Sequence, residues 1–327
     1  MREFYERWPD SLRKGYEGAS HLSHLAEDVD YIVVCGMGGS AAVGDFASMM
    51  ARLWGGPPVT VIKDFSPPFT PSKRTLLLGI SYSGDTLETL TCVANLAGHA
   101  YSVVTMSSGG RLSRISSSRG WAHIKIPEGI PPRAAFAYMV GALIGVVGSR
   151  LGLKDNDVAL AAKELEGGED VAARIVSHLK GNELVVVDTC TLTEALGVRA
   201  KSEFSENGKV HVKLQVYPES AHNDIVSFMG RLNPPVLVFK PSREPCKTVM
   251  DVVLKVYKSY GIKALELSVD LESPFSTLSN SMKLLKAIGL ASIALAEARG
   301  LDPSDTKIIK DYKRELKTEL EWMLKGL

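Results

Sequence analysis

Short apolar runs of strand length alternate with amphipathic helical stretches along the first half of the chain. The first run covers Tyr31–Cys35 (YIVVC), and a helical pattern follows from Ala41 to about Leu53. Later strand candidates lie at 59–62, 75–80, 101–106 and 123–127, with helical patterns near Thr86–Ala97 and Leu112–Arg119 between them. This alternation is typical of a parallel sheet with helices on both faces.

The second half of the chain repeats the scheme. Strand candidates lie at 183–188, 210–217, 234–240 and 264–270, and helical patterns cover 194–206, 244–260 and 278–299. The charged, helix-like stretch 154–182, interrupted by glycines, predicts a bridge between the halves. We therefore predict an α/β fold with two domains, residues 1–153 and 154–327. Each is expected to be a doubly wound, flavodoxin-like parallel sheet, so that the architecture is duplicated.

The composition of the chain supports two folded domains and argues against nucleic acid or a membrane as a partner. The 327 residues are 45% hydrophobic and 23% charged, which excludes a disordered or fibrous chain. The net charge of +1 argues against a protein that neutralises nucleic-acid phosphates. The uncharged stretch Ala134–Ser149 is shorter than the ~18 apolar residues of a membrane-spanning helix and predicts a core helix. With no signal-peptide pattern at the N-terminus, we expect a cytoplasmic protein with no membrane partner.

The four cysteines, at positions 35, 92, 190 and 246, are widely scattered and form no CxxC motif. We expect them to be small buried hydrophobic residues in a reducing cytosol. No HxH or HExxH pattern is present, so no metal site is predicted.

A glycine-rich loop, Gly36–Ala41 (GMGGSA), follows the first predicted strand and opens a helix. Its glycines let the backbone approach a ligand, and the helix N-terminus presents N–H groups to an anion. The loop also fits the dinucleotide fingerprint G-x-G-x-x-A, with Asp64 as the ribose-binding acid. A tight turn without a ligand is the third interpretation.

A second loop, Ser81–Thr86 (SYSGDT), follows another strand and precedes another helix. Both loops are expected at the carboxyl edge of the same sheet, where such folds bind ligands. Hydroxyls and backbone amides can hold a phosphate monoester without a lysine. The alternative is that Ser83 or Asp85 only caps the helix. The predicted phosphate-binding residues are Gly38, Gly39, Ser40, Ser81, Ser83 and Thr86.

Together with the later segments SEFSEN and SAHND, these loops resemble the sugar isomerase (SIS) fold. In combination they are similar to the bifunctional phosphoglucose/phosphomannose isomerases of archaea and some bacteria. The resemblance covers nearly the whole chain as two SIS subdomains. It implies interconversion of glucose 6-phosphate or mannose 6-phosphate with fructose 6-phosphate through a cis-enediol, without a metal ion or other cofactor.

The resemblance also implies roles for individual residues. Glu206 in SENGK would be the base that moves a proton between C1 and C2. His222 in SAHND would open the sugar ring, because imidazole gives and takes protons near neutral pH, and the partner subunit of a homodimer would supply it. Without the motif, Glu206 would be taken for a solvated carboxylate at a helix end. The other six histidines are interpreted as surface or packing residues.

Three cationic or polar positions complete the implied site. Arg133, before the uncharged helix, would stabilise the enediolate, although an arginine there could also extend to the surface. Near the C-terminus, Lys313 would assist ring opening and Thr306 would allow both C2 epimers to react. Lysines at positions 307, 310 and 317 are alternatives to Lys313, and a lysine run is often a solvated helix face.

Two other functions remain open at this point. A regulatory SIS module would bind a phosphosugar through the two loops but would need neither Glu206 nor His222. A nicotinamide-dependent dehydrogenase would use GMGGSA but would leave SYSGDT unexplained.

Overall fold

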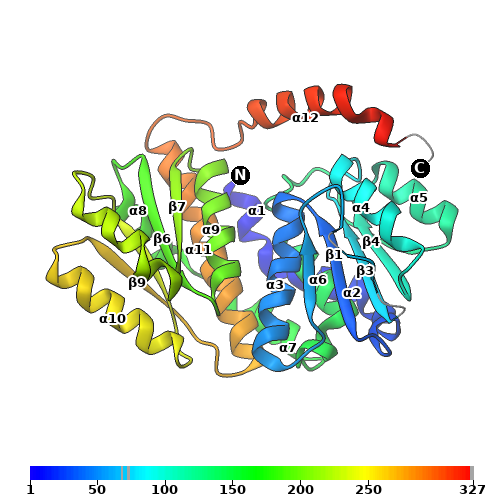
Figure 1. The fold of residues 1–327 in the computed structure, drawn as a ribbon, viewed down its shortest axis with the longest axis horizontal. Coiled ribbons are helices and arrows are strands. Elements are labelled where there is room, and N and C mark those ends of the chain that lie inside the picture. The colour runs from blue at the N-terminus through cyan, green and yellow to red at the C-terminus, as the bar shows by residue number, and fades with distance from the viewer. Residues whose placement is uncertain (68, 72–73, 325–327) are drawn as a thin grey trace. The chain divides into compact units, whose positions relative to one another are not determined.

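Two separate parallel sheets form the framework of the chain. The computed structural model describes residues 1–67, 69–71 and 74–324 (Figure 1). One compact unit, here the N-terminal unit, contains Arg7–Ala159 and the described residues from Thr306 onward. The other, here the C-terminal unit, contains Met1–Glu6 and Leu160–Asp305. This division differs from the expected halves 1–153 and 154–327 in the position of the boundary and in both terminal segments.

The sheet of the N-terminal unit has the strand order β2-β1-β3-β4-β5, and every pair is parallel. The strands form where the apolar runs predict them; the inner strands β1 and β3 are almost entirely buried, and the edge strands β2 and β5 are only partly buried. Their bounds are β1 (Tyr31–Gly36), β2 (Val59–Ile62), β3 (Thr75–Ile80), β4 (Ser102–Ser107) and β5 (Ala122–Lys125).

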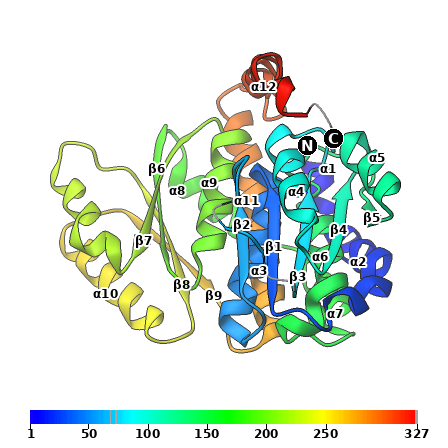
Figure 2. The same cartoon turned by 45° about the vertical axis from the view of Figure 1, so that its right-hand side comes forward.

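Helices cover both faces of this sheet (Figure 2). On one face, α4 (Leu87–Ala97) packs against Val33, Cys35 and Leu77, and α5 (Gly110–Arg119) lies along β4. On the other, α3 (Gly38–Trp54) packs on β1 and β2 so closely that a Cβ on Gly44 would meet Val34 at 2.9 Å. The buried helix α6 (Phe136–Val147) packs against α2 (Trp8–Ala19) and α3, which confirms the predicted core helix.

Short elements complete the N-terminal unit. They are α2 (Trp8–Ala19), η1 (Ser20–Ala26), η2 (Gly148–Leu151), α12 (Lys307–Leu320) and η5 (Glu321–Leu324). Within this unit, η5 packs against α4. The helix α7 (Asp157–Glu164) contains the boundary between the two units.

The C-terminal unit has the sheet order β7-β6-β8-β9, which repeats the first four positions of the other sheet, again with parallel pairs. The duplicated, flavodoxin-like α/β architecture is therefore confirmed. The strands are β6 (Leu184–Cys190), β7 (His211–Tyr217), β8 (Val236–Pro241) and β9 (Ala264–Val269). The helical elements are α1 (Arg2–Glu6), α8 (Glu169–Leu179), α9 (Glu194–Glu206), η3 (Glu219–His222), η4 (Asp224–Met229), α10 (Cys246–Ser259) and α11 (Pro274–Glu297).

The N-terminal helix α1 is part of the C-terminal unit because one large side chain anchors it there. Tyr5 is fully buried, and a Cβ on Gly289 of α11 would meet its ring at 2.1 Å. Tyr5 Oη donates to Glu203 Oε2 at 2.6 Å. A hydrophobic pattern in the sequence does not reveal this long-range insertion.

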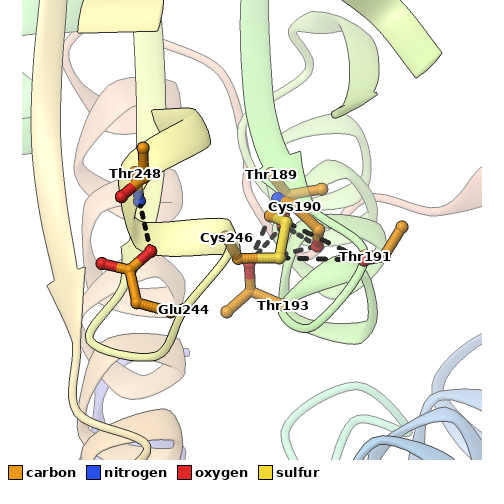
Figure 3. The surroundings of a disulfide bond; sticks show 7 residues. All are labelled: Thr189, Cys190, Thr191, Thr193, Glu244, Cys246 and Thr248. Carbon is orange, nitrogen blue, oxygen red and sulfur yellow. Dashed lines mark hydrogen bonds between the residues drawn. A yellow bond between two sulfur atoms is a disulfide. The ribbon is translucent and has the colours of Figure 1, made fainter. Parts of the chain in front are cut away.

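All four cysteines are paired, which corrects the expectation of free thiols. Cys35 on β1 is bonded to Cys92 on α4, and Cys190 on β6 is bonded to Cys246 on α10, with Cα–Cα distances of 6.0 and 5.9 Å. The partners are 57 and 56 residues apart, so no local motif marks them. They meet because a helix packs on the first strand of each sheet. Figure 3 shows the second bond among the threonines Thr189, Thr191 and Thr193.

No helix in the described ranges is long and apolar enough to cross a membrane.

Candidate active site

The first glycine-rich loop links the end of β1 to α3. Gly38 has a left-handed φ of +53°, which favours glycine, and α3 begins at this residue. Gly36 also has little room for a side chain, since a Cβ there would lie 3.2 Å from the carbonyl oxygen of Ile80. Ser40, in the first turn of the helix, is buried and accepts a hydrogen bond from the backbone N–H of Tyr82 at 3.3 Å. The two predicted phosphate loops are therefore directly connected.

The second loop, Ser81–Thr86, is held by its own hydroxyls. Ser81 Oγ donates to Thr86 Oγ1 at 3.0 Å and accepts from the backbone N–H of Gly84 at 3.1 Å. Ser83 is exposed, and its hydroxyl accepts from the N–H of Asp85. The N-cap of α4 is Thr86, so neither Ser83 nor Asp85 occupies the capping position that the alternative proposed. Because β1 and β3 are neighbours, both loops lie at one carboxyl edge.

A third loop, between β4 and α5, supports the second and was missed by the sequence reasoning. The backbone N–H groups of Ser108 and Leu112 donate to the carbonyls of Tyr82 and Gly84 at 2.7 and 2.9 Å. A Cβ on Gly84 would lie 1.8 Å from the carbonyl oxygen of Gly109, so the two turns are in close contact. The signal that could have found it is the SSGG segment after the strand at 101–106.

His123 belongs to a half-buried polar chain beneath this third loop. Its Nδ1 lies 2.8 Å from Thr105 Oγ1, and its Nε2 lies 3.3 Å from Ser107 Oγ. Ser107 Oγ donates to the carbonyl of Gly109 at 2.7 Å. Burial, and then the charge of Lys125, hold the pKa of His123 below its usual range. The imidazole is thus a neutral hydrogen-bonding group that supports the loop, which is a packing role as expected.

Arg133 lies in the same unit as the phosphate loops. It is 5% exposed and precedes α6, so it does not extend to the surface. The neighbouring carbonyl of Ala134 accepts a hydrogen bond from the indole of Trp8 at 2.9 Å, which ties this turn to α2.

Glu206 is the last residue of α9 in the C-terminal unit, and it is half-buried. A buried network lies one turn earlier, where Arg199 pairs with Glu203. Asn207, directly after Glu206, donates from Nδ2 to Glu203 Oε2 at 2.7 Å and to Ser292 Oγ at 3.1 Å. The helix end that carries Glu206 is therefore fixed from the protein interior.

His222 ends η3 and is exposed. The segment around it is anchored to β7, because Ser220 Oγ accepts from the N–H of Val216 at 2.9 Å and donates to Asp224 Oδ2 at 3.1 Å. Asp224 also forms an ion pair with Lys213 at 2.9 Å, and that ion pair lowers its pKa. His222 is thus carried on a fixed turn and faces solvent in the single chain.

Thr306 and Lys313 lie in the N-terminal unit. Thr306 directly precedes α12, and its carbonyl accepts from the N–H groups of Ile309 and Lys310. Lys313 is exposed on α12 and lies on the same helix face as Thr306, seven residues earlier. Lys310 and Lys317 share that face, whereas Lys307 does not. The choice of Lys313 among these lysines stays a prediction.

Within 1–67, 69–71 and 74–324, no group of three His, Cys, Asp or Glu side chains could hold a metal ion. Asp64, the ribose acid of the dehydrogenase alternative, follows β2 and accepts a hydrogen bond from the N–H of Phe65 at 2.6 Å.

Comparison with known proteins decides the family. A bifunctional phosphoglucose/phosphomannose isomerase of Aeropyrum pernix is 35% identical over 97% of this chain and 98% of that protein. One of Aquifex aeolicus is 30% identical over 97% of this chain and 99% of that protein. The chain belongs to the bifunctional phosphoglucose/phosphomannose isomerase family.

Further comparisons agree with this isomerase assignment. The family described as the bacterial phospho-glucose isomerase C-terminal SIS domain matches residues 169–316. A solved structure of a hypothetical protein from Thermus thermophilus has a TM-score of 0.78 at 16% identity and covers 97% of this chain and 89% of that chain, which shows the shared fold. The chain is an aldose–ketose isomerase of the SIS fold, and the dehydrogenase and regulatory alternatives are set aside.

Proposed function

We propose that this isomerase interconverts glucose 6-phosphate or mannose 6-phosphate with fructose 6-phosphate, without a metal ion. The similarity to the Aeropyrum pernix protein carries the proposal, because it covers 97% of the chain and 98% of that protein. Similarity over this length spans both phosphate loops as well as Glu206 and His222.

In the proposed mechanism, the first two loops bind the substrate phosphate. Backbone N–H groups at Gly38 and Gly39 and the positive end of α3 favour a dianion. The hydroxyls of Ser40, Ser81, Ser83 and Thr86 supply further hydrogen bonds. Because hydroxyls and amides meet the charge, the site needs no basic surface, which fits the net charge of +1.

Ring opening is the first chemical step of the proposed mechanism. The proton on the C1 hydroxyl must leave and the ring oxygen must gain one before the open-chain aldehyde forms. His222 suits this exchange because imidazole titrates near neutral pH, and the ammonium of Lys313 can donate to the ring oxygen.

Proton transfer then moves the carbonyl from C1 to C2. The Glu206 carboxylate removes the proton from C2 of the open aldose, and the electron pair forms the C1–C2 double bond of a cis-enediolate. A hydroxyl proton then passes from O2 to O1, the C2 carbonyl forms, and Glu206 returns its proton to C1, which gives fructose 6-phosphate. The guanidinium of Arg133 would stabilise the negative oxygen of the intermediate, where a fixed cation lowers the barrier. Thr306 would hold a water or assist rotation about C2–C3, so that both C2 epimers are accepted.

The proposal includes a homodimer in which His222 completes the site of the partner subunit. Its support is the exposed position of His222 and the solvent-facing apolar side chains that follow it, since Val226, Met229 and Leu232 are 59%, 78% and 69% exposed. Mixing inactive Glu206→Gln and His222→Ala chains should restore part of the activity. Absence of recovery after demonstrated subunit exchange would contradict supply of the histidine by the partner.

We also place the protein in the cytoplasm in this proposal, because its proposed substrates are charged phosphate esters that do not cross a lipid bilayer unaided. The two disulfides are compatible with that location in organisms whose intracellular proteins are rich in disulfides.

A coupled assay of the purified chain tests the reaction. Fructose, glucose and mannose 6-phosphates should all be converted, with and without a chelator such as EDTA. Loss of turnover on chelation would contradict the metal-free mechanism. Binding of these sugars without conversion would contradict the proposed substrates.

A further inference from the structure

The turn that follows Glu206 has an unusual backbone. Lys209 has a φ of +53°, in the left-handed region. Every other residue with a left-handed φ in 1–67, 69–71 and 74–324 is a glycine. A long side chain in this region is disfavoured, so it persists only where the surroundings fix it. Such residues concentrate at functional sites, and this one lies three residues after the proposed base.

The side chain of Lys209 folds back over its own turn. Its ammonium donates to the carbonyl oxygen of Glu206 at 2.5 Å and to the carbonyl oxygen of Asp305 at 2.7 Å. These two carbonyls come from distant parts of the C-terminal unit, the end of α9 and the segment after α11. Asp305 directly precedes Thr306, the residue proposed to govern epimer acceptance.

Other contacts hold the backbone of the turn in place. The guanidinium of Arg299 donates to the carbonyl of Gly208 and, at 3.5 Å, to that of Lys209. On the buried side, Asn207 donates to Tyr5 Oη at 3.0 Å and to Glu203 Oε2 at 2.7 Å. These contacts hold residues 207–209 of the turn, and the ammonium adds a link between the carbonyl of Glu206 and that of Asp305.

We propose that Lys209 is a positioning residue for the isomerase: its ammonium binds the carbonyls of Glu206 and Asp305, and so fixes both the base and the start of the segment that begins with Thr306. This inference rests on the proposed function, because it takes Glu206 as the base. Proton abstraction depends on the placement of the carboxylate, and a misplacement of about 1 Å can cost about 100-fold in rate.

The effect should fall on kcat more than on KM. The phosphate loops belong to the other unit, and the two carbonyls that the Lys209 ammonium binds lie outside them, so ground-state binding of the phosphate should change little. A merely structural lysine would instead lower thermal stability and leave the kcat of the folded fraction unchanged.

Lys209→Gly provides the first test, because glycine accepts the left-handed φ and the substitution removes the ammonium. We expect kcat to fall about 10- to 100-fold, KM for fructose 6-phosphate to stay within about threefold, and the melting temperature to be retained. A Lys209→Gly enzyme with wild-type kcat would overturn the inference.

Lys209→Cys provides a rescue experiment. The four native cysteines are in disulfides, so without reductant the new thiol is the one open to alkylation. Treatment with bromoethylamine creates a lysine-like side chain and should restore kcat at least tenfold. Lys201→Cys, at an exposed position on the preceding helix α9, is the control: neither the substitution nor the alkylation should change kcat. A folded Lys209→Cys enzyme that alkylation does not rescue would contradict the proposal.

Hydrogen exchange of backbone amides tests this inference separately from the proposed function, because the measurement does not require an active enzyme. Loss of the ammonium in Lys209→Gly should speed exchange in peptides covering 203–210 and 300–306, and aminoethylation of Lys209→Cys should reverse the same change. Unchanged exchange in both peptides would overturn the inference, whether or not the wild type is active. An inactive wild type would count against the proposed function alone.

Discussion

Asp188 is a buried carboxyl in the C-terminal unit that the proposed mechanism does not use. It lies on β6, is 0% exposed and accepts a hydrogen bond from Tyr257 Oη at 2.5 Å. Tyr257 Oη lies 2.8 Å from Tyr217 Oη, so the group forms a buried chain beneath α10. Burial raises the pKa of Asp188 to about 7, against the lowering effect of the two tyrosine hydroxyls. Below about pH 7 the native state therefore favours the protonated carboxyl.

Because of this raised pKa, Asp188 makes the free energy of unfolding depend on pH. Because the unfolded carboxyl has its ordinary pKa near 3.8, the native state holds an extra proton between that value and about pH 7. The contribution of Asp188 to the free energy of unfolding should therefore fall as pH rises from about 4 to about 7 and remain lower above it. Asp188→Asn should abolish this fall and stabilise the protein at pH 8, by up to about 4 kcal/mol.

Urea unfolding at pH 4.5 to 8 checks this prediction. The exposed Asp28→Asn variant is the control and should stay within about 0.5 kcal/mol of the wild type. An Asp188→Asn variant that is less stable than the wild type at pH 8 would show that the ionised carboxylate is favourable in the native state.

At the proposed phosphate site, the placement of the two loops at one sheet edge was predictable, because each loop has a local sequence pattern. Ser40 and Ser81 follow strands and precede helices in the sequence, and the fold brings both to one sheet edge. The contacts of the β4–α5 loop were not predictable, since they depend on which turns meet across the sheet. Lys209 was visible in the sequence as part of SENGK, but neither its φ nor its bond to Asp305 has a sequence signal.

At the scale of elements, each sheet carries one disulfide in an equivalent place. β1 corresponds to β6 in the strand order, and α4 corresponds to α10, so Cys35–Cys92 and Cys190–Cys246 join the same pair of elements. Each bond closes a loop of nearly the same length. Both therefore restrict the unfolded chain to a similar degree.

Removing either disulfide should destabilise the protein. A closed loop of about 57 residues corresponds to about 4 kcal/mol, or roughly 10 °C in melting temperature for a domain of this size. The double variants Cys35→Ser/Cys92→Ser and Cys190→Ser/Cys246→Ser should each show such a loss. A reductant should lower the melting temperature of the wild type but not that of the quadruple variant. Four free thiols in the unreduced protein, counted by mass spectrometry, would contradict the pairing.

Apolar periodicity predicted the strands of both sheets and their order of appearance, because buried parallel strands are continuous apolar runs. It could not predict to which of the two units each terminal segment belongs. α1 is short, and the burial of Tyr5 against Gly289 of α11 places it in the C-terminal unit. α12 is strongly amphipathic, yet none of its residues is buried, so its pattern alone does not tell what it contacts.

At the scale of the whole molecule, the residues proposed for the reaction are divided between the two units. The phosphate loops, Arg133, Thr306 and Lys313 lie in the N-terminal unit, and Glu206 and His222 lie in the C-terminal unit. Family membership over nearly the full length, rather than any single loop, is what identifies the reaction class. The near-zero net charge fits a small phosphorylated substrate held by hydroxyls and helix N-termini.

Conversion of fructose 6-phosphate in D2O, followed by proton NMR, tests the central claim that Glu206 moves a proton through an enediol. The wild type should place deuterium at C2 of the aldose product. Glu206→Gln should form that product at least about 100-fold more slowly, while Glu194→Gln, an exposed control on the same helix, should match the wild type. An aldose product without deuterium at C2 at any stage, or full activity of Glu206→Gln, would contradict the account.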